Sequence, residues 1–333
     1  MSKPVNYGLW YDFRNPEPWK QPFEDFYEQR FNQIVRAEGL GFASCWLTEH
    51  HFCDDGYTPS PLVLASAIAS RAKTMRLGTN LMLLPLHDPI RIAEDVATLS
   101  LITRGRFDLG VGIGYRQLEF DQFQRKISHR PSLIEEGIEI LRRSWSGAPV
   151  SFSGKRFEVG EVKVTPAPET QPKIYLGGMA PPAIERAARV ADGFLCTGGI
   201  GIDLYNEALE KQGKNIQDGD IIMGCWAIIA EDPEAEAAKI GEHVLYQANE
   251  YIKWGAFGPP DSTPLFENAA SAIENGLYQL WDADMAVTEL NKLLKTYPNI
   301  RDIHFWVQFP GESVESGDKR LRYIAEHVLP RLG

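Results

Sequence analysis

A Glu-His-His run between two cysteines, CWLTEHHFCD at 45–54, concentrates side chains that could do acid–base, thiol or metal chemistry. Adjacent side chains on an extended chain point to opposite sides, so His50 and His51 cannot easily chelate one ion together. The run has neither the His-x-His nor the His-Glu-x-x-His spacing of metal sites, and we expect no metal there. No pattern around Cys45 or Cys53 indicates a thiol nucleophile.

Two interpretations of this run stay open. In the first, Glu49 and one histidine form a buried, structural hydrogen-bonded pair. In the second, one histidine faces a ligand pocket, because the run follows an apolar segment that is expected to be a strand.

A polar residue and a set of glycines interrupt two other apolar segments. Asn80 stands in MRLGTNLMLLP (75–85), and the residues alone favour a hydrogen bond that fills the inside of a sheet. Gly110, Gly112 and Gly114 form a G-x-G-x-G at the end of FDLGVGIG, a spacing that differs from the dinucleotide-binding fingerprint. These glycines either let a flat ligand approach the backbone or relieve crowding.

The segment YLGGMAPPAIERAARVADGF has the pattern of a strand, a short turn and a helix. The strand ends at Gly177 and Gly178, and Pro181 or Pro182 begins the helix. Free backbone N–H groups at a helix N-terminus attract anions, so this turn is a candidate phosphate site. Many similar turns bind nothing.

The elements that must position these residues alternate regularly along the chain. Apolar, β-rich runs predict strands at 5–13, 43–49, 75–85, 107–114, 173–178, 194–199, 221–230 and 303–309. Helical patterns lie between them, at 23–38, 60–73, 89–103, 131–145, 181–192, 203–213, 233–254 and 284–296, with a last one in DKRLRYIAEHVLPRL.

Eight strand–helix units predict a closed (β/α)₈ TIM barrel, with a doubly wound open sheet as the alternative. We interpret 1–333 as a single domain with two insertions. One is a hairpin near 151–165, and the other is a Pro/Gly-rich segment near 255–283. Insertions at the C-terminal face of a barrel often serve as lids.

The overall composition narrows the class of protein. The 333 residues carry a formal net charge of −11, which does not favour nucleic acid or an anionic membrane as a partner. The N-terminus lacks the pattern of a signal peptide, and no apolar run is long enough to span a bilayer. The four cysteines are expected to be free thiols in a cytoplasmic protein.

Three blocks of sequence together resemble the bacterial luciferase-like family of flavin-dependent monooxygenases. They are WLTEHHF, RLGTNLMLLPLHDPIRIAEDVATLSLITRGRFDLGVGIG and YLGGMAPPAIERAARVADGF, in the family's order and spacing. The resemblance runs from Val5 to about Phe194 and resumes in the C-terminal helix. It implies a TIM barrel, usually dimeric, that takes reduced FMN from a separate NAD(P)H:flavin reductase. Oxygen would then form a C4a-(hydro)peroxyflavin that oxygenates a small organic substrate.

The resemblance also implies roles for particular residues. His50 would lie beside the flavin ring, with Glu49 as its structural or orienting partner, and His51 would turn into packing. Asn80 and Leu81 fall at a bulge, often with a cis peptide bond, that contacts the ring. The remaining cofactor residues would be Gly112, Gly177, Gly178, Met179, Ala180 and Arg130.

The last four of these residues concern the flavin phosphate. Many family members have serine or threonine in the phosphate loop, whereas this chain has Met-Ala-Pro-Pro at 179–182. Binding would then depend on the backbone N–H groups of 178–180 and on a basic residue such as Arg130.

A histidine suits proton transfer because its ordinary pKa lies near neutrality. The aromatic residues Trp10, Trp46, Phe52 and Trp306 would exclude water from the site. Two alternatives remain: a deazaflavin-dependent hydride transfer on the same fold, and a non-catalytic flavin-binding or supporting subunit. The segments 115–130 and 255–283, which would define the substrate, carry no interpretable motif.

Overall fold

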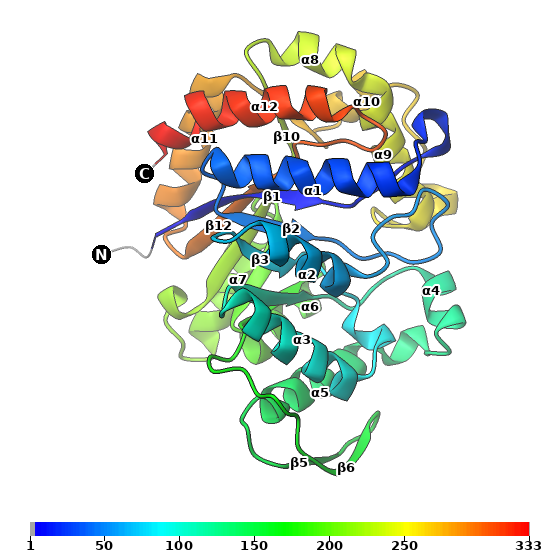
Figure 1. Cartoon of the computed structure of the whole chain (residues 1–333), viewed down its shortest axis with the longest axis vertical. Helices are drawn as coiled ribbons and strands as arrows, with labels where there is room; N and C mark the ends of the chain where they lie inside the picture. Colours follow the sequence, from blue (N-terminus) through cyan, green and yellow to red (C-terminus); the bar gives the residue numbers. More distant parts are fainter. Residues whose placement is uncertain (1–3, 333) are drawn as a thin grey trace.

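The computed structural model describes residues 4–332, and eight parallel strands form a closed barrel (Figure 1). The order around the barrel is β1-β12-β9-β8-β7-β4-β3-β2, so the first and last barrel strands along the chain pair with each other. The predicted TIM barrel is therefore confirmed. The barrel strands are β1 (Asn6–Tyr11), β2 (Ser44–Leu47), β3 (Arg76–Thr79), β4 (Phe107–Val111), β7 (Ile174–Gly177), β8 (Gly193–Thr197), β9 (Asp220–Cys225) and β12 (Ile300–Phe305).

Helices follow the strands along the chain and surround the barrel. Local sequence explains where they begin. For α3, the Asp88 side chain accepts hydrogen bonds from the N–H groups of Ile90 and Arg91, and Pro89 occupies the first turn. The main surrounding helices are α1 (Phe23–Gly39), α2 (Pro61–Arg71), α3 (Pro89–Thr103), α5 (Arg130–Ser144), α6 (Pro181–Val190), α7 (Ile202–Lys211), α11 (Ala283–Thr296) and α12 (Val314–His327).

The barrel strands are buried on both faces, as continuous apolar runs predict. Every residue of β2, β4, β7, β9 and β12 is buried. Large rings fill the interior, and a glycine makes room for one of them. A Cβ atom on Gly78 would lie 2.4 Å from the Trp46 ring, so a side chain at this position would displace that indole.

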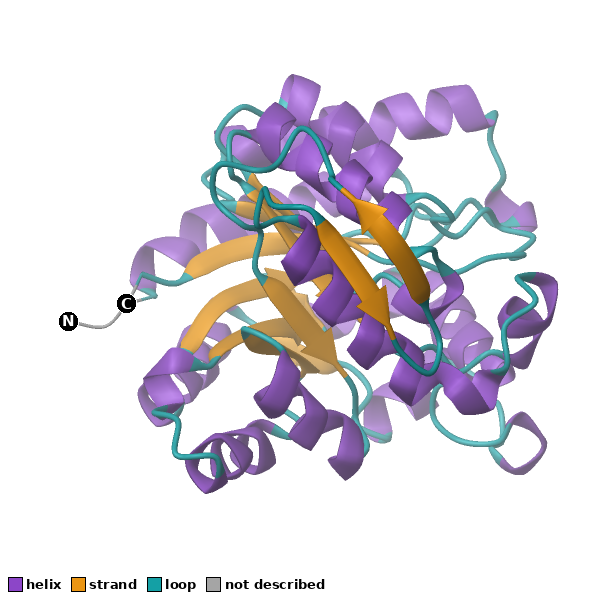
Figure 2. Cartoon of the chain, turned by 90° about the horizontal axis from the view of Figure 1, so that it is seen from below, coloured by secondary structure: helices purple, strands orange, loops and turns teal. Residues whose placement is uncertain are grey.

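Both predicted insertions lie outside the barrel. β5 (Val150–Ser153) and β6 (Glu158–Val162) form the expected antiparallel hairpin, which Figure 2 shows in front of the barrel. Segment 255–283 includes α10 (Ala269–Glu274) and β11 (Gln279–Trp281). β11 pairs with β10 (Ala227–Ile229) in a small parallel sheet of its own.

Several predicted elements have different bounds. The strand expected at 75–85 already ends at Thr79. The strand expected at 221–230 divides into β9 and β10, because from Trp226 onward the backbone pairs with the segment that contains Gln279 rather than with the barrel. The helix expected at 233–254 divides into α8 (Pro233–Lys239) and α9 (Gly241–Trp254). α12 begins before Asp318, because the Ser313 side chain caps it. None of the helices between residues 4 and 332 is both long and apolar enough to cross a membrane.

Candidate active site

The loops that follow the barrel strands place the Glu-His-His run at the C-terminal end of the barrel, where enzymes of this fold keep their chemistry. The run follows β2 directly. Figure 1 shows the short helix α4 (Gln117–Gln122) and the helix α9 at the same end of the molecule, opposite the chain termini. Side chains from both helices contact His50.

His50 is held by two polar partners that are distant in sequence. Its Nδ1 lies 2.8 Å from Oε1 of Glu119, and its Nε2 lies 3.1 Å from the hydroxyl of Tyr115. The residue is only 5% exposed, and this burial lowers the pKa of His50 although Glu119 opposes the shift. Because a carboxylate can only accept, Nδ1 donates to Glu119 and Nε2 is left as an acceptor.

Glu119 also organises the backbone of the run. Its Oε1 accepts from the N–H of His51 at 3.0 Å and lies 3.2 Å from Nη1 of Arg116. Burial alone would raise the pKa of Glu119, but the hydrogen bond and charge of His50, the His51 N–H and the Arg116 charge lower it overall. The carboxylate therefore stays ionised and fixes the tautomer of His50.

Sequence reasoning missed both partners of His50. Tyr115 precedes α4 and Glu119 lies within it, in a segment that carried no interpretable motif.

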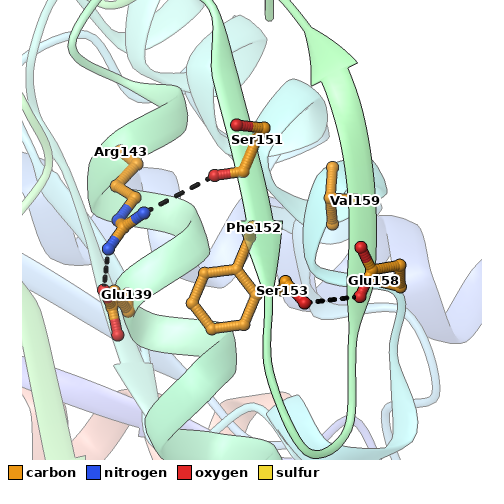
Figure 3. Close-up of a pocket in the computed structure, with 7 residues that line it drawn as sticks. All are labelled: Glu139, Arg143, Ser151, Phe152, Ser153, Glu158 and Val159. Atoms are coloured by element: carbon orange, nitrogen blue, oxygen red, sulfur yellow. Dashed lines mark hydrogen bonds and ion pairs between the residues drawn. The ribbon is translucent and has the colours of Figure 1, made fainter.

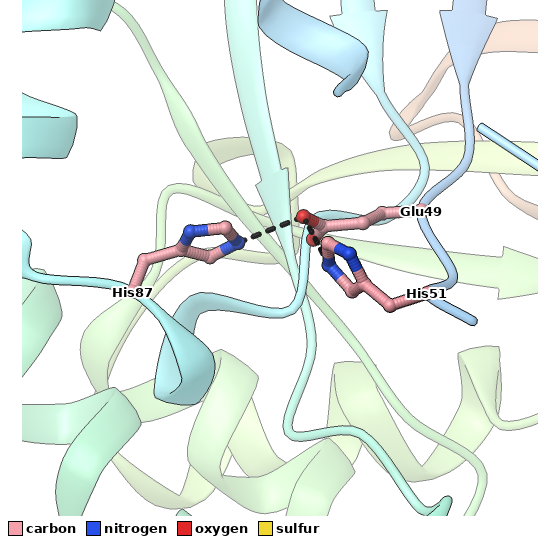
Figure 4. Close-up of side chains that lie close together, drawn as sticks. All are labelled: Glu49, His51 and His87. Atoms are coloured by element: carbon pink, nitrogen blue, oxygen red, sulfur yellow. Dashed lines mark hydrogen bonds and ion pairs between the residues drawn. The ribbon is translucent and has the colours of Figure 1, made fainter. Parts of the chain in front are cut away.

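Glu49 and His51 form the buried structural pair that was one of the two open interpretations, so Glu49 is not the partner of His50 that the resemblance implied. Oε1 of Glu49 lies 3.1 Å from Nε2 of His51 and 2.7 Å from Nε2 of His87, as Figure 4 shows. Its Oε2 accepts from the N–H of Leu83, which ties β2 to the loop after β3. Burial opposes ionisation, but the two histidines lower the pKa of Glu49 to about 2. The rings of His50 and His51 thus lie among different neighbours, as strand alternation predicts.

The Glu49 cluster also bears on the metal expectation. The sequence argument concerned only the adjacent pair 50–51, whereas the structure brings His87 in from the loop after β3. The ligand atoms of Glu49, His51 and His87 all lie within 4.8 Å of one another. In this arrangement both histidine Nε2 atoms contact Oε1 of Glu49, and Oε2 accepts from the N–H of Leu83.

The peptide bond between Asn80 and Leu81 is cis, the geometry that the family resemblance implied. The Asn80 side chain points into the barrel, where its Nδ2 lies 2.8 Å from Nε2 of His304. The Asn80 carbonyl accepts from Nε1 of Trp10 at 3.0 Å. The hydrogen bond that the sequence favoured for Asn80 is therefore present.

Leu81 lies over two of the predicted glycines. A Cβ atom would lie 2.4 Å from the Leu81 side chain if added at Gly112, and 2.5 Å from it if added at Gly177. Both glycines are needed because Leu81 occupies the space of their missing side chains. The structure thus brings Leu81, Gly112 and Gly177 together at the barrel mouth.

The predicted phosphate loop has fewer donors than its position suggests. Pro181 and Pro182 carry no N–H, and the N–H of Ala183 already donates to Ala180 at 2.9 Å. Within residues 4–332, the N–H groups of Met179 and Ala180 have no backbone acceptor. These two exposed donors are what this loop offers an anion.

Two other predicted residues lie differently from their expected roles. Arg130 donates to the Gly114 carbonyl at 2.9 Å, which places its guanidinium in the loop after β4. Phe52 is 53% exposed and packs on His51 and Phe123, because its turn has a positive φ of 56°. The Phe52 ring therefore does not pack against His50. Trp10, Trp46 and Trp306 are buried, as expected.

A buried arginine at the end of β1 also belongs to this region, and sequence reasoning missed it. Nε of Arg14 lies 2.6 Å from Oδ2 of Asp55, and four aromatic rings surround its guanidinium. The rings are those of Tyr57, Tyr246, Tyr251 and Trp254. The available signal was positional, because Arg14 follows the first strand as the Glu-His-His run follows the second.

Two cavities differ in their relation to this site. A cavity of about 310 Å³ lies beside it, lined by Glu17, Pro18, Phe52, Cys53, Asp54, Asp55, Arg116, Tyr246, Glu250 and Trp254. A second one, of about 430 Å³, lies between α5 and the hairpin (Figure 3). Its lining includes Arg143, which is paired with Glu139, and Ser153, which donates to Glu158 at 2.8 Å. Because the hairpin lies outside the barrel, we do not assign chemistry to the second cavity.

Comparisons with known proteins agree with this geometry. Residues 13–289 match the model of a family described as luciferase-like monooxygenase. An F420-dependent glucose-6-phosphate dehydrogenase of Amycolatopsis mediterranei is 31% identical over 318 residues, which cover 90% of this chain and 92% of that protein.

Two solved structures share the fold. The monooxygenase RslO1 from Streptomyces bottropensis has a TM-score of 0.81 and 23% identity, with 98% of this chain and 99% of that chain covered. The oxygenating constituent of 3,6-diketocamphane monooxygenase of Pseudomonas putida, solved with FMN, has a TM-score of 0.78 and 17% identity, with 99% of each chain covered.

Proposed function

The chain belongs to the luciferase-like monooxygenase family, whose members are oxidoreductases, and we propose that it oxygenates a small organic substrate with reduced FMN and O₂. The observation that carries this proposal is the setting of His50. Its Nε2 is an acceptor inside an aromatic enclosure that is almost closed to water. In this proposal a separate NAD(P)H:flavin reductase supplies the reduced FMN.

The residues at the barrel mouth fit a flat ring. Leu81 is partly exposed and fills the space over Gly112 and Gly177, so the Leu81 side chain is the surface that would meet the ring. The N–H groups of Met179 and Ala180 would hold the phosphate. Reduced FMN, when bound, supplies the electrons for the activation of O₂.

His50 is suited to accept and return one proton at Nε2. Burial keeps the imidazole neutral by lowering the pKa of His50, and Glu119 holds the proton on Nδ1. Tyr57 and Trp254 pack against the imidazole with ring centroids 4.9 Å and 5.1 Å away. These rings exclude water, which protects reactive species from side reactions.

A second candidate is hydride transfer with a deazaflavin, and the A. mediterranei relative favours it. Its named substrate, glucose 6-phosphate, fits this chain poorly. The cavity beside His50 is lined by four carboxylates, Glu17, Asp54, Asp55 and Glu250, against one guanidinium, Arg116. A phosphate dianion would be repelled there.

Cofactor titration separates these candidates. The purified protein is mixed with FMN and with the deazaflavin F420, each oxidised and reduced, and binding is followed by cofactor fluorescence. Our proposal expects reduced FMN to bind and the rate of its reaction with O₂ to change. Binding of F420 alone would favour hydride transfer, and binding of neither cofactor would indicate a supporting subunit.

A further inference from the structure

We propose that Arg14 binds an oxygen atom of an uncharged substrate beside His50. This inference rests on the proposed function, because it assumes that the substrate lies next to His50. Beyond the proposed function, it names a residue that binds the substrate and specifies that the substrate carries no charge.

The guanidinium of Arg14 has unused donors in a place where unused donors are costly. Its side chain is 0% exposed, and Asp55 pairs with Nε alone. Neither Nη1 nor Nη2 has a hydrogen-bond partner among the described residues. A buried N–H without an acceptor destabilises a fold, so these two nitrogens indicate a partner that the chain itself does not supply.

The position of Arg14 places that partner near His50. The guanidinium lies 5.4 Å from the ring centroid of Tyr57 and 4.8 Å from that of Trp254. These are the same two rings that pack against the His50 imidazole. An oxygen atom held by Nη1 or Nη2 is therefore within a small molecule's length of His50.

A cavity borders this enclosure. The cavity of about 310 Å³ is lined by Asp55, Tyr246 and Trp254, all three of which also contact Arg14. Trp254 is the last residue of α9, and Gly255 follows it with a φ of +87°. The Trp254 indole thus contacts both the cavity and the guanidinium, so its displacement would join them.

The surrounding charges select an uncharged ligand. Three buried carboxylates, on Asp12, Asp55 and Glu119, already offset the guanidiniums of Arg14 and Arg116. Burial, together with the Asp55 charge, raises the pKa of Asp12 to about 6. Glu17, Asp54 and Glu250 add negative charge at the cavity. A substrate carboxylate or phosphate would increase this excess, whereas a carbonyl oxygen accepts the same N–H groups without charge.

Two probes of the same shape test the inference on cofactor-free protein. Affinities for cyclohexanone and for cyclohexanecarboxylate are measured by ligand-observed NMR. Wild-type protein should bind the ketone more tightly than the carboxylate. Arg14→Lys keeps the charge beside Asp55 but loses the guanidinium fork, and it should weaken ketone binding by about tenfold to a hundredfold.

Arg301→Lys is the matched control. Arg301 is also a buried arginine, but its nitrogens are bonded to Asp220, Pro298, Ile300 and Gln217. This change should leave ketone binding unaltered. Equal ketone affinity in wild type and Arg14→Lys, or tighter binding of the carboxylate, would overturn the inference.

A second measurement covers the case in which Arg14→Lys does not fold. In wild-type protein labelled with ¹⁵N-arginine, cyclohexanone should shift one buried guanidinium signal, and Trp254→Ala should speed this exchange by opening the enclosure. An unshifted guanidinium spectrum overturns the inference. Both measurements use cofactor-free protein. Their outcome therefore does not depend on whether FMN binds in the cofactor titration.

Discussion

The His50 imidazole donates from Nδ1 to the Glu119 carboxylate over 2.8 Å, although 69 positions separate the two residues. This contact joins the end of β2 to the short helix α4. It gives the imidazole one orientation and one tautomer. The proposed proton chemistry depends on it, because the other nitrogen then faces the enclosure as an acceptor.

Replacement of the two histidines should separate their roles. His50→Ala should still bind reduced FMN but lose oxygenation by about 10²–10⁴-fold, the usual contribution of a general acid or base. His51→Ala should instead lower the free energy of unfolding by about 1–3 kcal/mol, because it removes a buried partner of Glu49. Turnover per folded molecule and urea unfolding are the measurements. An inactive His51→Ala beside an active His50→Ala would reverse the assignment.

Glu119→Gln tests whether this carboxylate is a positioning residue. The Glu119 hydrogen bond and charge raise the pKa of His50 against the effect of burial, so their loss should lower that pKa further. An NMR titration of the His50 imidazole should show the change, and the acid limb of the activity profile should move to lower pH. Asp121→Asn, on the same helix but exposed, is the control. An unchanged His50 titration in Glu119→Gln would contradict the role.

The Glu49 cluster should make the free energy of unfolding decrease both at acidic pH, where Glu49 becomes protonated, and at higher pH, where His87 loses its proton. The pKa of Glu49 is lowered from its ordinary value of 4.5 to about 2, so its contribution is complete above pH 4.5 and lost as the pH falls toward 2. This contribution is about 3 kcal/mol. The Glu49 charge raises the pKa of His87 despite burial, so the His87 contribution is complete below pH 6.5 and lost as the pH rises through the raised value.

Urea unfolding of wild type and Glu49→Gln from pH 2 to pH 8 measures this dependence. The stability difference between the two proteins should be largest between about pH 4.5 and pH 6.5 and should shrink on both sides. A difference that stays constant across the whole range would show that ionisation of Glu49 contributes nothing.

The phosphate position is best tested at Met179. Its side chain is 58% exposed, so Met179→Asp adds a negative charge beside the free N–H groups without repacking. FMN binding should weaken more than riboflavin binding, and fluorescence titration measures both. Gly178→Asp is a poorer test, because a Cβ atom at Gly178 would lie 2.5 Å from that of Ala183.

Met285→Asp is the matched control for the phosphate test. Met285 is 48% exposed and lies in the first turn of α11. This change should affect FMN and riboflavin equally little. Equal losses for both flavins in Met179→Asp would place the phosphate elsewhere.

Sequence periodicity was sufficient for the barrel and for the place of the site. Each barrel strand is buried on one face by the side chains inside the barrel and on the other by the surrounding helices. Such a strand requires a continuous apolar run, which can be recognised in the sequence. The C-terminal end of β2 then locates the Glu-His-His run at the barrel mouth. Strand alternation also separates His50 from His51, because that rule is local.

What each of these side chains contacts was decided by the tertiary structure. Glu119 and Tyr115 lie in a segment whose local pattern gives no sign of chemistry, and only closure of the barrel brings them to His50. The same holds for His87, which completes the Glu49 cluster from another strand end. The spacing of residues within one segment reports only the geometry of that segment. These contacts join residues that lie far apart in the sequence, and the residues meet only when the loops after several strands converge at one end of the barrel.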